Sequence, residues 1–228
     1  MKKVLITGWN KWIGLATTKL FLEKWFRVII LARDFSDFKI KNDNLEKIEF
    51  DLKNTSKILE LCNKIWKIDI LINNAWIMHW INYLEYNEKL QNDILNVNLV
   101  AQIELIKWFE KLNDKLRIVN NASIAGEIWH PDIWYGITKA WVINMTKSFA
   151  KILWPKGIVI NCISAWPVET DMLSSIPEAR KKSIKSNVMT GRFARPEEIA
   201  ETFYFLWVVS PEYINWICID VNNWAFMR

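Results

Sequence analysis

Four side chains of this sequence have the types and spacing that proton transfer requires. Tyr135 and Lys139 are four residues apart, so a helix would place a phenol and an ammonium on one face. A free tyrosine titrates near pH 10, and a shift to pH 7 takes about 4 kcal/mol. One cation at about 4 Å and an effective dielectric constant near 20 supplies about 4 kcal/mol. Such a pair is also typical of a solvated helix face, but Ser123 after a predicted strand and Asn98 favour a catalytic interpretation.

A turn near the N-terminus has the pattern of a phosphate-binding loop. Residues 7–14 follow the short apolar run 4–6 and open a helical stretch. Glycines let the backbone approach a pyrophosphate, and the helix N-terminus supplies free N–H groups and the positive end of a dipole. Many strand–helix turns contain glycine for packing, and the strand–turn–helix context favours a dinucleotide here. The predicted cofactor contacts in this turn are Gly8, Asn10, Lys11, Trp12, Ile13 and Gly14.

The end of the second predicted strand bears on the choice between two dinucleotides. Arg33 follows this strand, and Arg33 and Lys11 can both face a 2′-phosphate, which favours NADP. Asp34 keeps NAD as the alternative, because an acidic residue here can bind the ribose hydroxyls. The two cations are otherwise ordinary surface residues.

The apolar pattern alternates between short β-rich runs and longer helical periods. The predicted strands are 3–7, 27–31, 47–50, 69–72, 117–121, 158–162 and 217–220. The predicted helices are 13–24, 55–65, 88–111, 135–153, 171–187 and 196–208. This alternation predicts a parallel sheet covered on both faces. No linker or repeat divides the chain, so we expect a single α/β domain over 1–228, a Rossmann-like doubly wound sheet of about seven strands.

Composition excludes several classes of function. No apolar run approaches the roughly 18 residues of a membrane span, and no cleavage site follows the first apolar run, so we expect a cytoplasmic protein. The net charge is +5, with basic and acidic residues interleaved, which predicts no nucleic-acid partner. The 3 cysteines and 2 histidines lack ligand spacing, which predicts neither a disulfide nor a metal site.

With these residues assembled, the chain resembles the short-chain dehydrogenase/reductase superfamily over nearly all of its length. Its C-terminal half is most similar to the 3-oxoacyl-(acyl-carrier-protein) reductases. The segments that carry the resemblance are 7–14, 51–52, 73–76, Asn98, Ser123, Tyr135 with Lys139, 167–172, 191–193 and 221–227.

The resemblance implies an NAD(P)H-dependent carbonyl reductase or alcohol dehydrogenase. Tyr135 would be the general acid, or the base in the reverse direction. Lys139 would lower the pKa of Tyr135 and hold the nicotinamide ribose, and Ser123 would bind the substrate oxygen. Asn98 would hold a water molecule that links Lys139 to solvent. The further cofactor contacts that it implies are Asp51, Leu52, Asn74, Ala75, Trp76, Tyr135, Lys139, Pro167, Val168 and Thr170.

The resemblance also implies partners. It suggests a small carbonyl or alcohol substrate, with a 3-oxoacyl thioester of fatty acid biosynthesis as the single best expectation. It further suggests a homotetramer or homodimer that assembles through the helices near 88–111 and 135–153.

Tryptophan and glycine contents are anomalous. The chain has 15 tryptophans and 6 glycines, whereas average usage of about 7% predicts roughly 16 glycines. Tryptophan stands where the resembled family usually has glycine at Trp9, Trp12, Trp25, Trp66, Trp76, Trp154, Trp166, Trp216 and Trp224. Each such exchange costs roughly 1–3 kcal/mol, and nine together exceed a typical total stability of about 5–15 kcal/mol. Our hypothesis is that UGA codons for glycine are written as tryptophan; a decayed pseudoenzyme and a deliberate glycine-to-tryptophan design are the alternatives.

A second class of function is a non-catalytic dinucleotide sensor or an inactive homologue on the same fold, since fold alone does not give function. The four intact proton-handling residues favour the enzyme. If every tryptophan is taken literally, a third interpretation predicts no cofactor binding.

Overall fold

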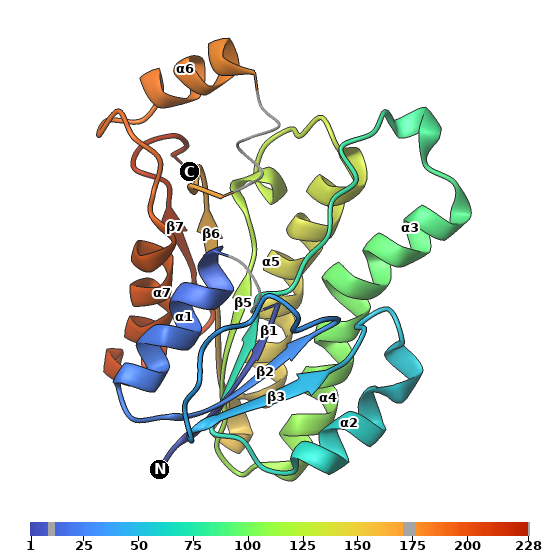
Figure 1. The fold of residues 1–228 in the computed structure, drawn as a ribbon, viewed down its shortest axis with the longest axis vertical. Helices are drawn as coiled ribbons and strands as arrows, with labels where there is room; N and C mark the ends of the chain where they lie inside the picture. The colour runs from blue at the N-terminus through green and yellow to red at the C-terminus, as the bar shows by residue number, and fades with distance from the viewer. Residues whose placement is uncertain (9–11, 171–176, 228) are drawn as a thin grey trace.

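The computed structural model describes residues 1–8, 12–170 and 177–227, which form a parallel sheet flanked by helices (Figure 1). The strands are β1 (Lys3–Thr7), β2 (Arg27–Ala32), β3 (Leu45–Glu49), β4 (Ile70–Asn73), β5 (Arg117–Asn121), β6 (Val159–Ala165) and β7 (Cys218–Val221). Their order in the sheet is β3-β2-β1-β4-β5-β6-β7, and every neighbouring pair is parallel. The predicted doubly wound seven-stranded fold is therefore confirmed.

Helices cover both faces of the sheet. They are α1 (Trp12–Glu23), α2 (Ile58–Ile65), α3 (Glu88–Leu95), α4 (Ala101–Leu112), α5 (Ile133–Leu153), α6 (Glu178–Ser186) and α7 (Pro196–Tyr204). Helices α2, α4 and α5 pack on one face, around Leu5 and Leu71, and α1 and α7 pack on the other, around Ile6. Figure 1 shows α6 at the top of the molecule, apart from the helices that flank the sheet.

The central strands are apolar in a continuous run because both of their faces are covered. In β2, Val28 and Ile30 belong to the core beneath α1 and α7, and Ile29 and Leu31 belong to the core beneath α2, α4 and α5. These alternating directions follow from the two-residue period of a strand.

Two predicted boundaries change in an informative way. The predicted helix 88–111 is α3 and α4 joined by a π-helical turn at Asn96–Val100, a local irregularity that is frequent at functional sites. The predicted strand 158–162 continues as β6 to Ala165, because Ser164 and Ala165 pair with Asp220 and Val221 of β7. Of the predicted helix 171–187, residues 171–176 lie outside the described residues.

Among the described residues other than glycine, most of those with a left-handed backbone conformation are tryptophans. Among the described residues, the non-glycine positions with positive φ are Trp12, Trp25, Trp66, Trp80, Trp216, Asn223 and Trp224, with φ between 45° and 76°. Trp66 directly follows α2 and Trp25 is the second residue after α1, close to where a left-handed glycine commonly ends a helix. Trp76, Trp154 and Trp166 have no positive φ, and Trp9 lies outside the described residues.

Two expectations from composition concern membranes and cysteines. None of the helices described here is long and apolar enough to cross a bilayer. Among the described residues, Cys62, Cys162 and Cys218 form no disulfide.

Candidate active site

The carboxyl ends of β1 and β4 are joined by a buried polar network. The Thr7 hydroxyl accepts hydrogen bonds from the backbone N–H groups of Asn74 and Ala75, each at 3.0 Å. The Asn74 amide donates to the carbonyl oxygens of Thr7 and Gly8 at 3.1 and 2.7 Å. This network holds the glycine turn against the loop that follows β4.

Glycine is required at position 8 both by its left-handed backbone conformation and by the close approach of Ala75. Its φ is +70°, and a Cβ at this position would lie 2.7 Å from the Cα atom of Ala75. No side chain fits such a contact, so only glycine lets the first turn pack against the loop after β4. Gly8 also lines a cavity, where its bare backbone suits a pyrophosphate.

A cavity of about 330 Å³ lies along the carboxyl ends of β1 to β4, and it collects most of the predicted cofactor contacts. Those that line it are Gly8, Trp12, Ile13, Gly14, Arg33, Asp51, Leu52, Asn74, Ala75, Trp76 and Thr170. Asn10 and Lys11 lie outside the described residues. The Thr170 hydroxyl is buried and has no hydrogen-bond partner among the described residues, so it suits a polar ligand atom. The residues present therefore fit a dinucleotide, apart from the bulk of two indoles.

Arg33 and Asp34 differ in how they relate to this cavity. Arg33 lines it, whereas the Asp34 carboxylate is engaged by its neighbour Ser36. The Ser36 hydroxyl donates to Asp34 at 2.6 Å and the Ser36 N–H at 2.8 Å, and these bonds lower the pKa of Asp34. Of these two residues, Arg33 is the one that lines the cavity.

The catalytic candidates meet where a short turn crosses helix α5. Ser123 begins the 3₁₀ turn Ile124–Gly126, and its hydroxyl accepts a hydrogen bond from Ala125. A Cβ on Gly126 would lie 2.5 Å from the backbone carbonyl carbon of Lys139. Only glycine permits this approach, which sets the turn against α5, where Ser123 and Tyr135 line one cavity.

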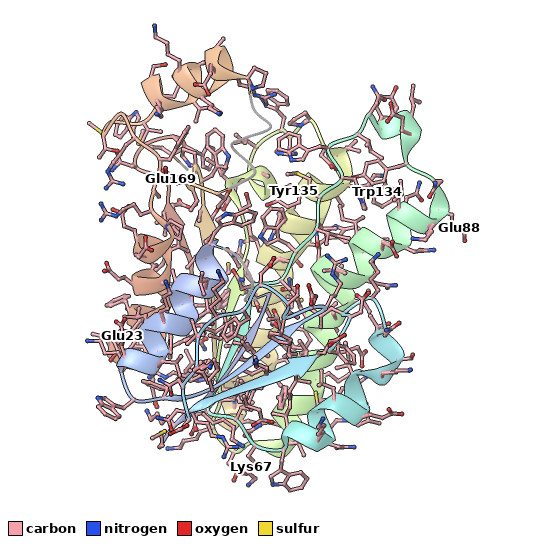
Figure 2. The ribbon with its side chains drawn as sticks, viewed as in Figure 1. Glu23, Lys67, Glu88, Trp134, Tyr135 and Glu169 are labelled. Carbon is pink, nitrogen blue, oxygen red and sulfur yellow. The ribbon has the colours of Figure 1, made fainter. Side chains whose placement is uncertain are left out.

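Tyr135 and Lys139 are both buried, with 6% and 1% of their surfaces exposed. Figure 2 shows Tyr135 at the upper end of α5, below α6. The Lys139 ammonium lies 5.6 Å from the centre of the Tyr135 ring and donates to the carbonyl oxygen of Asn121 at 2.7 Å. The predicted pair on one helix face is therefore present.

Burial acts on the acidity of both groups. Burial raises the pKa of Tyr135 above its ordinary value; the hydrogen bond from Ser123 opposes this, and the charge of Asp132 adds to it. Tyr135 is consequently held in the protonated form that donates a proton. Burial also lowers the pKa of Lys139 to about 7, because desolvation disfavours a charged group. The expected lowering of the Tyr135 pKa by Lys139 stays a prediction.

Asn98 lies in the π-helical turn and is fully buried. Its amide oxygen accepts from the N–H of Ile77 at 2.8 Å, and its amide nitrogen donates to the Ile77 carbonyl oxygen and the Thr138 hydroxyl. Its side chain thus joins the loop after β4 to α5. The water that the family pattern implies stays a prediction.

A second cavity of about 150 Å³ opens beside Tyr135 and contains Ser123. Its walls are mainly apolar and include Met78, Ile128, Val168 and Ile184. Arg180 and His130 also line it, and burial lowers the pKa of His130. Pro167 lines a third cavity, on the side of β7.

Two tryptophans narrow the site. Trp12 lines the larger cavity at the start of α1, where a phosphate would meet the helix. The Trp76 ring lies 5.5 Å from the Tyr135 ring and 5.8 Å from the Lys139 ammonium. Both indoles line the cavity in which the predicted cofactor would lie.

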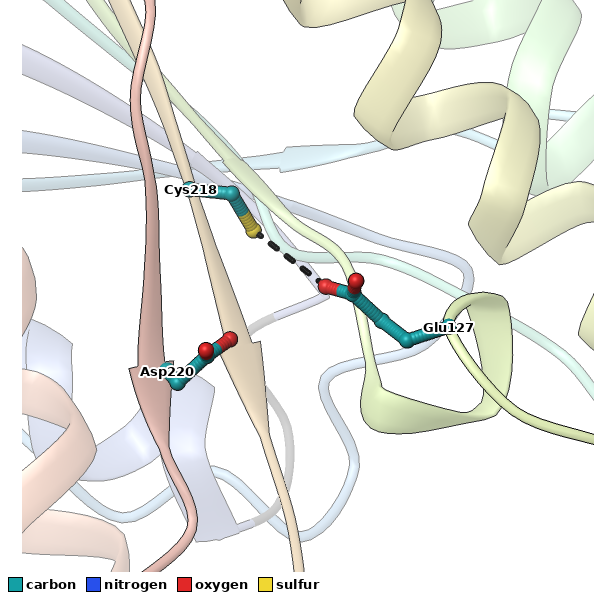
Figure 3. A group of neighbouring side chains, drawn as sticks. All are labelled: Glu127, Cys218 and Asp220. Carbon is teal, nitrogen blue, oxygen red and sulfur yellow. Dashed lines mark hydrogen bonds between the residues drawn. The ribbon is translucent and has the colours of Figure 1, made fainter. Parts of the chain in front are cut away.

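Sequence reasoning missed two features. Asp132 contacts the backbone of Tyr135, and the signal was an aspartate directly before a helix, which is a typical N-cap. Cys218 also meets Glu127 and Asp220, with one ligand atom of each within 4.8 Å of the others (Figure 3). The Cys218 thiol donates to Glu127 across 91 residues of sequence, a separation that no spacing rule detects.

Comparison with known proteins agrees with this geometry. A family model described as enoyl-(acyl carrier protein) reductase matches residues 11–221. The chain is 30% identical to a 3-oxoacyl-(acyl-carrier-protein) reductase FabG of Aquifex aeolicus over 243 residues, covering 99% of this chain and 97% of the relative. It is 29% identical to the FabG of Thermotoga maritima over 237 residues, covering 97% and 96% of the two chains.

Solved structures with bound cofactors are also similar. A 4-hydroxyisoleucine dehydrogenase complexed with NADH has a TM-score of 0.92 and 28% identity, covering 99% of this chain and 98% of the other. A Leptospira borgpetersenii short-chain dehydrogenase with NAD⁺ has a TM-score of 0.90 and 27% identity, with coverages of 99% and 93%. ElxO with NADP has a TM-score of 0.88 and 27% identity, with coverages of 98% and 98%.

Proposed function

Because the chain belongs to the short-chain dehydrogenase/reductase family of oxidoreductases, we propose that it is an NAD(P)H-dependent carbonyl reductase, and an alcohol dehydrogenase in reverse. One observation carries the proposal. Ser123 and the buried Tyr135 line the same small cavity, and this cavity adjoins the larger one that fits a dinucleotide through Met78, which lines both.

The proposed roles follow from what each side chain can donate. Tyr135, held protonated by burial, gives its proton to the substrate carbonyl oxygen as that oxygen becomes a hydroxyl. The Ser123 hydroxyl binds the same oxygen and orients it. Lys139 and the cavity residues at the carboxyl ends of β1 to β4 hold the cofactor, which supplies hydride when bound. Asn98 fixes the loop after β4 against α5.

We favour NADP as the cofactor. Arg33 reaches the cavity, whereas Asp34 is occupied by Ser36 and is poorly placed to bind ribose hydroxyls. A guanidinium is well suited to a phosphate because it offers several donors in a fixed plane. The relatives solved with NADH and NAD⁺ keep NAD as the alternative.

The proposed substrate is a 3-oxoacyl thioester. The apolar walls of the smaller cavity suit an acyl chain, and the relatives named FabG are 3-oxoacyl-(acyl-carrier-protein) reductases. We also propose a homodimer or homotetramer formed through α4 and α5. On α5, Trp141 and Ile152 are 46% and 66% exposed, which leaves apolar surface to cover.

A non-catalytic protein is the second candidate, and Trp76 is the observation that favours it. Its indole packs on both Tyr135 and Lys139, so the sequence as written crowds the reaction centre.

Binding and turnover measured together separate the two candidates. NADPH is titrated by fluorescence, and its oxidation is then followed at 340 nm with a panel of ketones and 3-oxoacyl esters. Binding followed by oxidation supports the reductase. Tight NADPH binding without oxidation across the panel supports the sensor, and an absence of binding rejects both.

A further inference from the structure

The Asp132 carboxylate is buried where three segments of the chain meet. Asp132 is 1% exposed and is the N-cap of α5. It lies between the start of α5, the loop after β4 and the segment that leads into α3. A carboxylate so far from water persists only when several donors satisfy its oxygens.

Four donors from these segments reach the two oxygens. Oδ1 accepts from the Tyr135 N–H at 3.1 Å and the Tyr86 hydroxyl at 2.7 Å. Oδ2 accepts from the N–H groups of Trp80 at 3.0 Å and His79 at 3.3 Å, and the Tyr86 hydroxyl lies 2.8 Å from it. Tyr86 is itself 7% exposed and packs in a small core with Ile94 and Tyr135.

These contacts join the two walls between which a substrate must lie. The loop after β4 supplies Met78 to both cavities and Trp80 to the smaller one. Tyr135 lies on the opposite wall, one helical turn into α5. Removing the central carboxylate would take away the bonds between the 79–86 segment and the start of α5, while Asn98 would still link Ile77 to Thr138.

We propose that Asp132 is a positioning residue, and that with Tyr86 it ties the 79–86 segment to the start of α5 so that Tyr135 is held at a fixed place in the substrate cavity. The inference rests on the proposed role of Tyr135 as the general acid. It assigns a function to a residue that does not itself touch the reacting atoms.

The charge of Asp132 has a second effect on the same tyrosine. It disfavours the phenolate, and therefore contributes to the raised pKa of Tyr135. The other titratable groups around this tie are Tyr86 and His79 on the loop side, His130 two residues before Asp132, Arg180 of α6 near His130, and Lys139 farther along α5. Removing the carboxylate charge should lower the pKa of Tyr135, because this charge disfavours the phenolate. The charges of the other titratable groups are not altered by the substitution.

Asp132→Asn and Tyr86→Phe test the tie in the full-length protein. Asparagine can still cap α5, but its NH₂ group cannot accept from the loop N–H groups. Since small displacements of a reacting group cost up to about 100-fold in rate, kcat should fall about 10- to 100-fold in Asp132→Asn, with KM for the cofactor unchanged. The pH profile of alcohol oxidation should move to lower pH in Asp132→Asn only, since Tyr86→Phe keeps the charge.

Asn87→Ala is the matched control. Asn87 caps α3 by accepting from the Leu90 N–H, as Asp132 caps α5, but the Tyr135 N–H is bonded to Asp132 and not to Asn87. This variant should lose thermal stability and keep the kcat and pH profile of the parent. A folded Asp132→Asn protein with the kcat and pH profile of the parent would overturn the proposal.

Hydrogen exchange separates this inference from the proposed function. Amide protection at residues 79, 80 and 135 should fall in Asp132→Asn, whether or not the protein turns over any substrate. If the parent shows no turnover, the proposed function fails and the tie is judged on exchange alone. Unchanged protection at these amides would overturn the tie in either case.

Discussion

Replacing the left-handed tryptophans with glycine is expected to make the protein more stable. The six positions are Trp12, Trp25, Trp66, Trp80, Trp216 and Trp224. An L-residue with a side chain pays roughly 1–2 kcal/mol in this conformation, whereas glycine adopts it freely. The usual loss on removing a large apolar side chain is small here, because five of the six are at least 41% exposed.

The magnitude follows from two opposing effects. Relief of the backbone conformation gives roughly 1–2 kcal/mol at each position, and the greater freedom of glycine in the unfolded chain takes back roughly 0.5–1 kcal/mol. The net gain is about 0.5–1 kcal/mol for each position and about 3–6 kcal/mol for all six, if distant positions are additive. For a chain of this size, that raises Tm by about 10–20 °C.

Urea unfolding followed by circular dichroism measures this gain in the six-fold variant. Trp141→Gly is the matched control, because Trp141 is 46% exposed but lies within helix α5. Glycine in a helix interior should cost about 1 kcal/mol, so the control changes stability in the opposite direction. A six-fold variant no more stable than its parent would refute the conformational argument.

The hypothesis that UGA codons for glycine were written as tryptophan stays a prediction. The left-handed conformation supports it at five of the positions named from the sequence and adds Trp80 to them. The gene decides the matter: UGG codons at Trp12, Trp76 and Trp166 would refute the hypothesis, and UGA codons would support it.

Three further predictions concern the site. Arg33→Ala should weaken NADPH binding about tenfold or more and leave NADH binding unchanged in titrations, and equal losses would remove Arg33 from the 2′-phosphate site. Gly126→Ala should lower both Tm and kcat, because its new Cβ would lie 2.5 Å from the Lys139 carbonyl carbon; a stable, fully active variant would contradict the close approach. Lys139→Met should unfold at higher urea than its parent below pH 7, since burial lowers the folded pKa of Lys139 to about 7 from 10.5. Between pH 7 and 10.5 the Lys139 amine is protonated in the unfolded chain and neutral in the folded one, so the parent gains stability as the pH rises. The difference in stability between Lys139→Met and its parent should therefore shrink over this range. A difference that stays constant with pH would contradict the buried charge.

Much of the fold follows from local sequence patterns. The short apolar runs predicted all seven strands because parallel strands are buried on both faces, and Pro196 followed by two glutamates predicted the start of α7. The main difference from the structure was the prediction of one helix over 88–111, where the structure has α3 and α4. The π-helical turn around Asn98 contains neither proline nor glycine, so the sequence carries little sign of it.

The candidate site was predictable where single motifs define it. The first turn, Ser123 and the Tyr135–Lys139 pair all came from spacing, and the structure brings them to one edge of the sheet. The acidity of Tyr135 was not predictable, because it depends on burial and on Asp132, which only the folded chain reveals. The tie through Tyr86 joins residues 46 positions apart, and no local pattern contains it.

The most direct test of the account is the rate of a Tyr135→Phe variant. The chain with glycine at the six left-handed tryptophans and at Trp76 serves as the parent, so that the cofactor cavity is open. General acid catalysis contributes about 10²- to 10⁴-fold, and NADPH-dependent ketone reduction should fall by this amount while NADPH still binds. Reduction by Tyr135→Phe at the rate of its parent would contradict the account.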